Sequence, residues 1–475
     1  MMGCTSVLSA LTLCFSVVTF AHAQTPLPVA EPGYVKHGTK FYILGGHLLT
    51  EPTNSSIGMS TTTTAPPSHF HVLDLSKPWK ASSPAWSSLP KITDLIRTSV
   101  VKVALSKDGR TLIAFPSVAA NANANAIANN NNNNSNNSTL ATGGPSDAKM
   151  AAARFEFGTM TWMASSAVIE RTLGDLSPVL EPTTGRVFVL GGYKGPGEDR
   201  MDMYSFEEDS LISLSLPTVL LGAATTTTTT DQTPLSPWGI GAKAVWSQHR
   251  QSLLYFGGKN RGVGGGGTQD QNRVVAEYTP GDSTWKFPAT SGSVVSTFWH
   301  CVATNDNGTL LFAYGGIDAQ NPSSTTQQGL SILDLTTMTW RTAPRGENRV
   351  LSACTVAGDH FLVWGGANAL SDGRLAIVDA GKRDSSILIF DITMNAWVDS
   401  YTPSQDYLLP PPDIPRAGND DSGASFGASF SAVIAIIALV TIAILAMVIH
   451  ICCMIRRGAR KEREGVFGNN NDQVK

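Results

Sequence analysis

Residues 360–366 read HFLVWGG, a β-like run (His360–Trp364) that ends in the pair Gly365-Gly366, and the same arrangement occurs four more times in the chain. The other runs and pairs are Phe41–Leu44 with Gly45-Gly46, Arg186–Leu190 with Gly191-Gly192, Ser252–Phe256 with Gly257-Gly258, and Thr309–Tyr314 with Gly315-Gly316. Short apolar runs bounded by glycine are typical of β-strands. Their recurrence predicts one supersecondary unit repeated through most of the chain.

A tryptophan follows most of the glycine pairs. A second β-like segment precedes it in three units: Val274–Tyr278 with Trp285, Leu330–Leu335 with Trp340, and Ile387–Asp391 with Trp397. Trp86 and Trp162 stand in the corresponding places of two earlier units. Glycine permits close backbone approach and positive φ, and tryptophan supplies a large apolar body that can fill the wedge between neighbouring sheets. We therefore expect both residue types to be structural.

The pattern resembles the kelch repeat, in which each unit is a four-stranded blade of a β-propeller. The resemblance covers Pro26–Pro410. It implies an all-β fold with six blades, and it leaves five or seven blades open. It also implies a binding protein, since kelch propellers mostly bind partners and only the branch that resembles galactose oxidase is catalytic.

Each expected blade reads as strand, tight turn, strand, loop, strand, tight turn and strand. Two blades are imperfect: the second has Phe115-Pro116-Ser117 in place of the glycine pair, and the third has Leu211 where a tryptophan is expected. Both keep the apolar alternation that packing requires. The expected blades are Pro26–Pro90, Lys91–Ser166, Ala167–Gly222, Ala223–Thr290, Ser291–Pro344 and Arg345–Pro410.

The long insertions share one topological position. In an antiparallel four-stranded blade, the loop between the second and third strands and the connection to the next blade emerge on one face, and both tight turns emerge on the other. Repeat proteins often bind through the loop-bearing face, although polar homopolymers are also tolerated as surface bulk without a role. The low-complexity tracts are Thr61–Thr64, Asn121–Asn137, Thr225–Thr230 and Gly262–Gly267. The expected loops are Leu48–Ser68, Ser117–Met150, Lys259–Asn272, Ile317–Gly329 and Ala367–Ser385, with the blade connection Gly222–Pro237.

The two ends of the chain predict a membrane protein. Residues 1–23 hold the apolar stretch Val7–Phe20 and end in Ala21-His22-Ala23, a signal-peptide pattern without a basic n-region. Phe430–Ile455 carries no charged residue and is long enough to cross about 30 Å of hydrocarbon, and the five basic residues that follow place the tail, 456–475, in the cytosol. A proline-rich stalk, 404–429, precedes the span. We expect a type I single-pass protein at the plasma membrane or in another secretory compartment.

Composition and cysteine usage agree with this placement. The chain is 42% hydrophobic with a net charge of −3, which excludes a basic field for nucleic acid. Cys4 and Cys14 lie in the expected signal peptide, and Cys452 and Cys453 at the cytosolic membrane edge are candidates for lipidation. Cys301 and Cys354 remain for the oxidising side. A disulfide between them needs Cα atoms within about 7 Å, which a sequence does not show.

Five Asn-x-Ser/Thr motifs fit an extracytoplasmic glycoprotein. Asn54 and Asn307 carry more weight than the others, because such motifs arise by chance in asparagine-rich tracts. Asn307 belongs to the tight-turn face, and a glycan there would oppose a partner lying flush at that edge. The remaining candidates are Asn133, Asn136 and Asn137.

Three short motifs suggest chemistry and are set aside. Gly262-x-Gly264-x-x-Gly267 matches a dinucleotide fingerprint, but a strand follows it where a helix is needed. Gly423-x-Ser425-x-Gly427 matches a nucleophile elbow, but it lies in the stalk without a sheet to present it. His69 and His71 share a strand face at a metal-ligand spacing, but no third ligand is evident nearby.

We therefore expect a propeller that binds a protein or glycan partner outside the cytosol and that has no catalytic residues, metal or cofactor. A structural wall or adhesion spacer is the first alternative. The second is a copper-radical oxidase resembling galactose oxidase, whose chemistry needs a tyrosine cross-linked to cysteine, a second tyrosine and two histidines. Cys301 and Cys354 are the only cysteines available for that role, and no suitable histidine pair accompanies them.

Overall fold

The computed structural model describes residues 26–46, 69–92, 95–96, 98, 100–117, 150–169, 176–191, 201–214, 241–258, 275–294, 297–318, 329–369, 375–377 and 387–408. The expected signal peptide, the low-complexity tracts, the stalk beyond Leu408, the expected span and the tail lie outside these residues.

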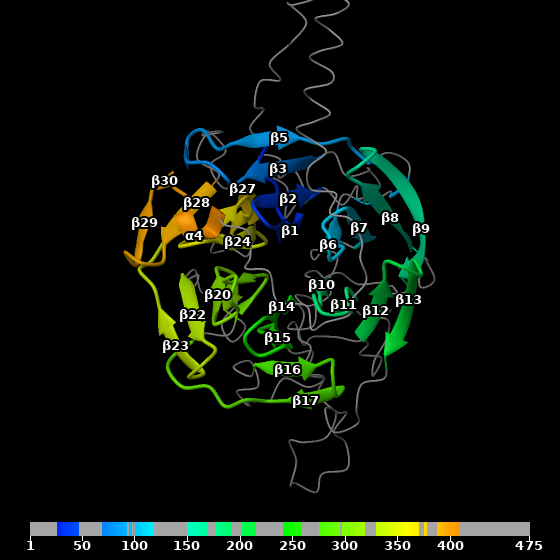
Figure 1. Ribbon diagram of the computed structural model, residues 1–475. Helices are drawn as coiled ribbons and strands as arrows, with labels where there is room; N and C mark the ends of the chain where they lie inside the picture. The colour runs from blue at the N-terminus through cyan, green and yellow to red at the C-terminus, as the bar shows by residue number, and fades with distance from the viewer. Residues whose placement is uncertain are drawn as a thin grey trace, which may run out of the picture. The chain divides into compact units, whose positions relative to one another are not determined.

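In the described part of the chain, six four-stranded antiparallel sheets form the blades of a propeller (Figure 1). The first strand of each blade lies next to the central axis, and the last lies at the rim. The blades follow one another around the ring in chain order, from blue to orange in Figure 1. The expected all-β, six-bladed architecture is confirmed.

The strands of each blade are consecutive in sequence. Blade 1 contains β1 (Gly33–His37), β2 (Lys40–Leu44), β3 (Phe70–Asp74) and β5 (Trp86–Ser88). Blade 2 contains β6 (Val101–Leu105), β7 (Thr111–Pro116), β8 (Met150–Glu156) and β9 (Thr161–Ile169). Blade 3 contains β10 (Ser177–Leu180), β11 (Val187–Leu190), β12 (Met201–Ser205) and β13 (Ser210–Leu214). Blade 4 contains β14 (Lys243–Ser247), β15 (Ser252–Phe256), β16 (Ala276–Thr279) and β17 (Thr284–Lys286). Blade 5 contains β19 (Cys301–Thr304), β20 (Leu310–Tyr314), β22 (Leu330–Asp334) and β23 (Thr339–Thr342). Blade 6 contains β24 (Ala353–Ala357), β25 (His360–Trp364), β28 (Ile387–Asp391) and β29 (Ala396–Val398).

A few elements were not expected from the sequence. β18 (Thr297–Phe298) pairs with β21 (Ile317–Asp318), and β26 (Ala367–Ala369) pairs with β27 (Leu375–Ile377), so two of the expected loops begin as strands. β4 (Trp79–Lys80) pairs with β30 (Ser400–Tyr401), and the short helix α4 (Gln405–Leu408) follows. β9 also continues to Ile169, past the expected end of blade 2 at Ser166.

The glycine pairs bind neighbouring blades together. In the four pairs at positions 45–46, 257–258, 315–316 and 365–366, every glycine has a positive φ, between 65° and 105°. In three of these pairs, the second glycine donates its N–H to a carbonyl ahead of the next blade: Gly258 to Thr297 at 2.9 Å, Gly316 to Arg349 at 3.0 Å, and Gly366 to Val29 at 2.8 Å. A Cβ on Gly257 would lie 2.6 Å from the Thr297 carbonyl oxygen. The backbones meet so closely that only glycine fits. Gly191 also has a positive φ, and its partner Gly192 lies outside the described residues.

The five tryptophans each pack between their own blade and the preceding one, as expected. Trp162 contacts Phe70 of blade 1, Trp285 contacts Tyr278 in the cluster that joins blades 3 and 4, and Trp340 contacts Phe256 of blade 4. The indole N–H of Trp162 donates to the Pro90 carbonyl at 2.8 Å, and that of Trp397 donates to the Pro344 carbonyl at 2.9 Å. The tryptophans fill the wedges, and Trp162 and Trp397 also bond to the linker between blades.

The two imperfect blades form complete sheets. β7 ends in Pro116, which pairs with Val101, and Ser117 donates its N–H to the Val100 carbonyl at 3.0 Å. Leu211 packs in the cluster between blades 2 and 3, in the position that tryptophan holds elsewhere. Apolar pairing is therefore enough to form a blade without the glycine pair or the tryptophan.

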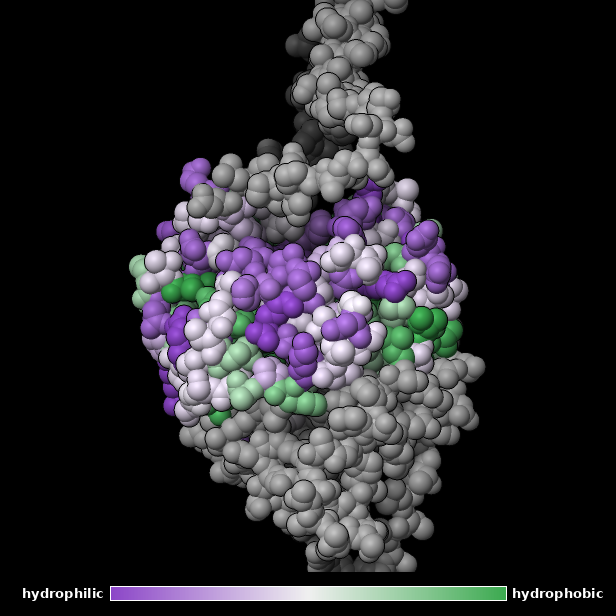
Figure 2. All heavy atoms as spheres, turned by 60° about the horizontal axis from the view of Figure 1, so that its bottom comes forward, coloured by the Kyte–Doolittle hydropathy of each residue, from purple (hydrophilic) through white to green (hydrophobic). Residues whose placement is uncertain are grey.

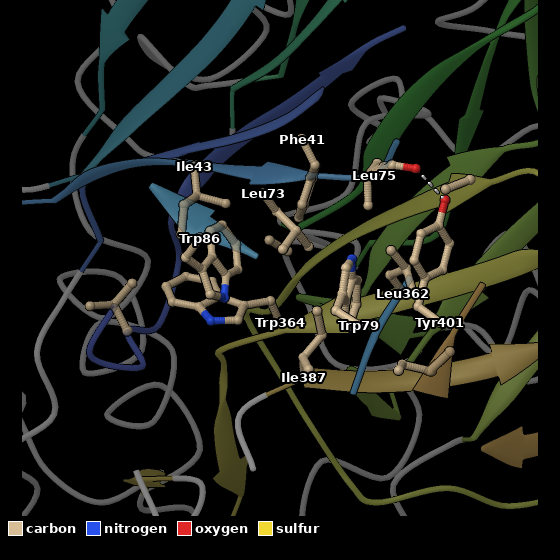
Figure 3. Packing of buried hydrophobic residues seen from close by; sticks show 14 residues of the cluster. Phe41, Ile43, Leu73, Leu75, Trp79, Trp86, Leu362, Trp364, Ile387 and Tyr401 are labelled. Carbon is tan, nitrogen blue, oxygen red and sulfur yellow. Dashed lines mark hydrogen bonds between the residues drawn. The ribbon is translucent and has the colours of Figure 1, made fainter. Parts of the chain in front are cut away.

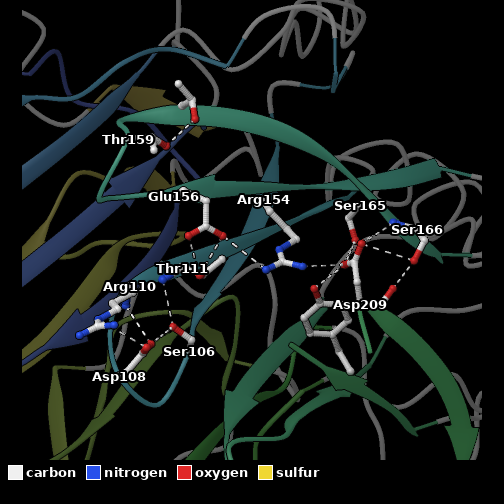
Figure 4. A network of polar contacts seen from close by, with 12 residues as sticks. Ser106, Asp108, Arg110, Thr111, Arg154, Glu156, Thr159, Ser165, Ser166 and Asp209 are labelled. Atoms are coloured by element: carbon white, nitrogen blue, oxygen red, sulfur yellow. Dashed lines mark hydrogen bonds and ion pairs between the residues drawn. The ribbon is translucent and has the colours of Figure 1, made fainter. Parts of the chain in front are cut away.

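A polar network reinforces the blade 2–3 interface, where the tryptophan is missing (Figure 4). Asp209 of blade 3 accepts hydrogen bonds from the Ser165 hydroxyl and the Tyr204 hydroxyl, both at 2.6 Å, and Arg154 of blade 2 lies 3.8 Å away. Burial alone would raise the pKa of the Asp209 carboxyl, but these hydrogen bonds and Arg154 hold it below its usual value. The carboxylate therefore stays ionised and links the two blades.

The ring closes between blades 1 and 6 through packed side chains (Figure 3). Trp86 of blade 1 and Trp364 of blade 6 have ring centroids 5.6 Å apart. Trp79 stacks on Tyr401 at 4.9 Å, and the Tyr401 hydroxyl donates to the Leu75 carbonyl at 2.8 Å. The four strands of every blade come from one continuous part of the chain, so no blade contains a strand from the other end of the chain. The side-chain contacts and the β4–β30 pair therefore close the ring.

Candidate functional site

The strand order defines two faces of the propeller. On the loop-bearing face, the first strand of each blade begins and the second strand ends; on the tight-turn face, the first strand turns into the second. The segments 47–68, 118–149, 192–200, 259–274 and 319–328, which join second to third strands, start and end on the loop-bearing face, and so does the blade connection 215–240. The described strand ends are arranged as the expected placement requires, and the insertions themselves lie outside the described residues.

A cavity of about 340 Å³ runs along the axis between the first strands of the blades. Tyr34 of β1, Val302 of β19 and Cys354 of β24 lie in its wall, which all six blades supply. Burial raises the pKa of the Tyr34 phenol to about 12, against a hydrogen bond to the Val302 backbone that lowers it. The phenol is therefore neutral at physiological pH.

Two lysines line the cavity near the loop-bearing face. Lys102 is the second residue of β6, and Lys243 is the first residue of β14, so both lie where the inner strands begin. The Lys102 ammonium lies 3.4 Å from the Glu31 carboxylate, and the two side chains are 8% and 1% exposed. Burial lowers the pKa of the neighbouring His300 to about 3, with a further contribution from Lys243. At this end of the cavity, Lys102 is thus buried beside Glu31, whereas Lys243 is half-buried.

The tight-turn end of the cavity is crossed by an ion pair and the C-terminal helix. Lys36 of β1 pairs with Asp306, which lies in the β19–β20 turn of blade 5. The Lys36 ammonium also lies over the ring of Tyr407 in α4, 5.2 Å from the centroid. The Tyr407 hydroxyl donates to the Gly38 carbonyl at 2.9 Å, and a Cβ on Gly358 would meet Ser404. Residues 404–407 therefore rest on the tight turns of blades 1 and 6.

Four residues with a left-handed backbone conformation form an arc on the loop-bearing face, where the inner strands begin. Gly241, Trp299, Leu351 and Glu31 each precede a first strand by two residues, and their φ values are 76°, 61°, 57° and 58°. The Trp299 N–H donates to the Gly241 carbonyl at 3.1 Å, Leu351 to Trp299 at 2.8 Å, and Glu31 to Leu351 at 2.7 Å. The arc links blades 4, 5, 6 and 1. The sequence analysis missed Trp299, Leu351 and Glu31, because only Gly241 is of a residue type that signals a positive φ. It also missed Lys102 and Lys243, because no local pattern shows that they line one cavity.

Cys301 and Cys354 form a disulfide between the inner strands of blades 5 and 6, with Cα atoms 5.9 Å apart. Both residues are buried, at 0% and 2% exposed. This separation settles the question that the sequence left open. Neither cysteine is free to cross-link to a tyrosine, which is the modification that the oxidase alternative requires.

The histidine pair on β3 and the preceding loop is close but has no further metal ligand among the described residues. The His69 and His71 rings stack with centroids 6.0 Å apart, and the His71 Nδ1 lies 3.2 Å from the Ser88 hydroxyl. Burial lowers the pKa of His71 to about 4, helped by His69 and Lys91. Within the described ranges, no group of three histidine, cysteine or acidic side chains gathers to hold a metal.

Of the glycosylation candidates, only Asn307 lies in the described part of the chain. It is exposed in the β19–β20 turn, and its side-chain oxygen accepts a hydrogen bond from the Thr309 hydroxyl at 2.8 Å. Asn307 thus lies on the tight-turn face, beside Asp306. Asn54, Asn133, Asn136 and Asn137 fall outside the described residues, as do the lipidation candidates Cys452 and Cys453.

The side shown in Figure 2 presents a mostly hydrophilic described surface, with hydrophobic residues in small separate patches. Such scattered apolar residues are normal for a protein surface. Between Pro26 and Leu408, the described residues include no helix long and apolar enough to cross a bilayer, and the expected span at 430–455 lies beyond them.

No protein-family model matches the chain, and no curated protein matches it.

Proposed function

We propose that this chain is a kelch-type propeller protein of the extracytoplasmic side, anchored to a membrane through 430–455, and that its loop-bearing face binds a protein or glycan partner. The position of α4 is the observation that carries the proposal. Its contacts with Gly38 and Gly358 hold the first residues of the expected stalk, 404–408, on the tight-turn face. The described chain therefore leaves the propeller on the tight-turn face, opposite the ends of the long connections.

The buried disulfide supports the extracytoplasmic side. Disulfides form and persist in oxidising compartments and are rare in the cytosol. Cys301 and Cys354 come from different blades, so the bond joins two structural units. The same bond opposes the oxidase alternative, because it occupies both cysteines that a cross-linked tyrosine could use.

The experiment compares partner capture by two variants of the full chain displayed on cells. In the first, the tracts 121–137 and 262–267 on the loop-bearing face are removed. In the second, Lys77 and Arg110, exposed on the tight-turn face, are changed to glutamate. Proximity labelling from the full chain should identify a partner that the first variant loses and the second keeps.

Two outcomes would contradict the proposal. Equal labelling by the wild type and the first variant would place binding elsewhere or support the spacer alternative. Oxidation of primary alcohols by the purified, copper-loaded protein would restore the enzyme alternative. A protease added to intact cells should digest the propeller if it is displayed on the cell surface and should leave it intact if it lies in the cytosol.

A further inference from the structure

The lining of the axial cavity becomes more exposed from the loop-bearing end to the tight-turn end. Pro32, Leu176 and Ser177 lie at or just before the start of inner strands, and all three are buried. Gln248 and Asp306 lie in the turns that follow β14 and β19, and both are exposed while they line the same cavity. The cavity therefore opens on the tight-turn face.

An ion pair and α4 border one side of this opening. Lys36 of blade 1 pairs with Asp306 of blade 5, and the Lys36 ammonium lies over the ring of Tyr407. Blade 6 lies between blades 1 and 5 in the ring, so the pair spans the side on which α4 rests (Figure 1). Leu180 of blade 3 and Gln248 of blade 4 line the other side. A ligand can therefore enter between these two residues and the ion pair.

The charges at the opening are balanced. Among the described residues, Lys36 and Asp306 are the charged lining at this end, and they pair with each other. Their side chains are 16% and 54% exposed. A charged ligand would have to give up water and would meet a like charge in one of the two groups, which costs free energy. A neutral ligand avoids that cost.

Hydrogen-bonding groups and apolar surface meet at the same opening. The Oδ1 of Asp306 meets Lys36, so Oδ2 is left to accept a hydrogen bond from a ligand. The Oε1 of Gln248 accepts from the indole N–H of Trp246 at 3.1 Å, so the amide N–H groups of Gln248 are left to donate. Half-buried Trp246 and Leu180 add apolar wall. A sugar-like ring matches this lining, because it has hydroxyls that both donate and accept and apolar C–H faces.

We propose that the tight-turn end of the axial cavity is a binding site for a neutral polyhydroxylated ring, a monosaccharide or cyclitol, whose hydroxyls donate to Asp306 and accept from Gln248. A volume of about 340 Å³ is at the lower end of the range of small-molecule pockets, roughly 300–1,000 Å³, which suits a small ligand. The site goes beyond the proposed partner binding, because it opens on the opposite face. It operates whether or not the long loops bind a partner.

The test measures binding of glucose, mannose and myo-inositol to the full-length protein by ligand-observed NMR and thermal unfolding. Asp306→Ala should weaken binding by about tenfold, since a hydrogen bond to a charged group is worth about that factor. Gln248→Ala should weaken it by about fivefold, as expected for a neutral hydrogen bond. Both residues are exposed, so both variants should fold. Asp108→Ala is the matched control, because Asp108 is 58% exposed on the same face and does not line the cavity, and it should bind like the wild type.

Glucuronate and glucosamine test the class of ligand, since each adds one charge to a similar ring and should bind more weakly than glucose. Tighter binding of either one would overturn the assignment to a neutral ligand. No binding of any of the three neutral probes at millimolar concentration would overturn the site itself. Binding that Asp306→Ala and Gln248→Ala both leave unchanged would do so as well, by placing the ligand elsewhere on the molecule.

Glucose coupled through its first carbon to a soluble polymer distinguishes two sources of the same chemistry. Binding as tight as that of free glucose would indicate the terminal sugar of a glycan, and weaker binding would indicate a free sugar. Both results support the site.

Discussion

At the scale of single residues, the backbone conformation of a few positions holds the blades in register. The glycines of the pairs at 257–258, 315–316 and 365–366 adopt positive φ, and the second glycine of each pair donates its N–H to the chain just ahead of the next blade. Trp299, Leu351 and Glu31 adopt the same left-handed region without being glycine. Such residues are strained unless their surroundings hold them, and here a chain of backbone hydrogen bonds does so.

Gly365→Ala should destabilise the protein by about 1–3 kcal/mol, the usual cost of a strained left-handed residue. Its φ is 65°, and the added Cβ would lie 2.6 Å from the Val29 carbonyl oxygen, across the closure between blades 6 and 1. Denaturant unfolding of the full-length protein measures the loss. Gly281→Ala is the matched control, because its Cβ meets nothing within 4 Å, and it should change the free energy of unfolding little.

At the scale of elements, the inner strands β19 and β24 are joined covalently, whereas the other blade interfaces depend on side-chain packing and hydrogen bonds among the described residues. The cysteines come from corresponding places in consecutive blades, since each lies within two residues of the start of its first strand. The cluster around the bond includes Tyr314 and Phe361, whose rings lie 6.1 Å apart. The disulfide therefore supports an interface that is already well packed.

Loss of this disulfide in the double variant Cys301→Ser/Cys354→Ser should lower the free energy of unfolding by about 2–4 kcal/mol, the typical contribution of a disulfide. The propeller should still form, because apolar packing provides most of its stability. Thiol alkylation followed by mass spectrometry should detect no free Cys301 or Cys354 in the native wild type, even after mild reductant, since both are buried. Rapid alkylation of the untreated native protein would contradict the bond.

At the scale of the whole molecule, the ring is held shut where the first and last blades meet. Val29, ahead of blade 1, accepts a hydrogen bond from Gly366 of blade 6, and Trp86 packs against Trp364. Beyond the last blade strand, β30 returns to pair with β4, and Tyr401 stacks on Trp79. The residues that follow blade 6 therefore secure the closure and then lead the chain onto the tight-turn face.

Tyr401→Ala should weaken closure by about 3–5 kcal/mol, as expected for truncation of a buried aromatic side chain. Hydrogen exchange should accelerate first in β2, β3, β25 and β28, on either side of the closure, before it changes in blades 3 and 4. Tyr401→Phe should cost less, because it removes only the hydroxyl that donates to Leu75. Tyr407→Phe, which removes a hydroxyl bonded to Gly38 on the tight-turn face, serves as a control outside the closure cluster. Uniform acceleration in all six blades would contradict local closure.

Much of the fold followed from the repeat itself. The apolar runs, the glycine pairs and the tryptophans are local signals, so the blades and their order could be predicted without coordinates. Six was the expected number of blades, with five or seven left open until the structure showed six. The roles of Gly366 and Trp397 followed from the same physical reasons, close backbone approach and burial of a large side chain. The predictions failed where short pairings depend on distant partners: β4 with β30, and β26 with β27 inside an expected loop.

By itself, the sequence determined that this chain is a ring of antiparallel blades, because the spacing of strands and turns is encoded locally. Only the tertiary structure decided that Cys301 meets Cys354, that Lys102 and Lys243 share one cavity, and that α4 rests on the tight turns. These contacts join residues far apart in the chain, and their distances depend on how the closed ring places each inner strand around the axis. No local pattern carries that information.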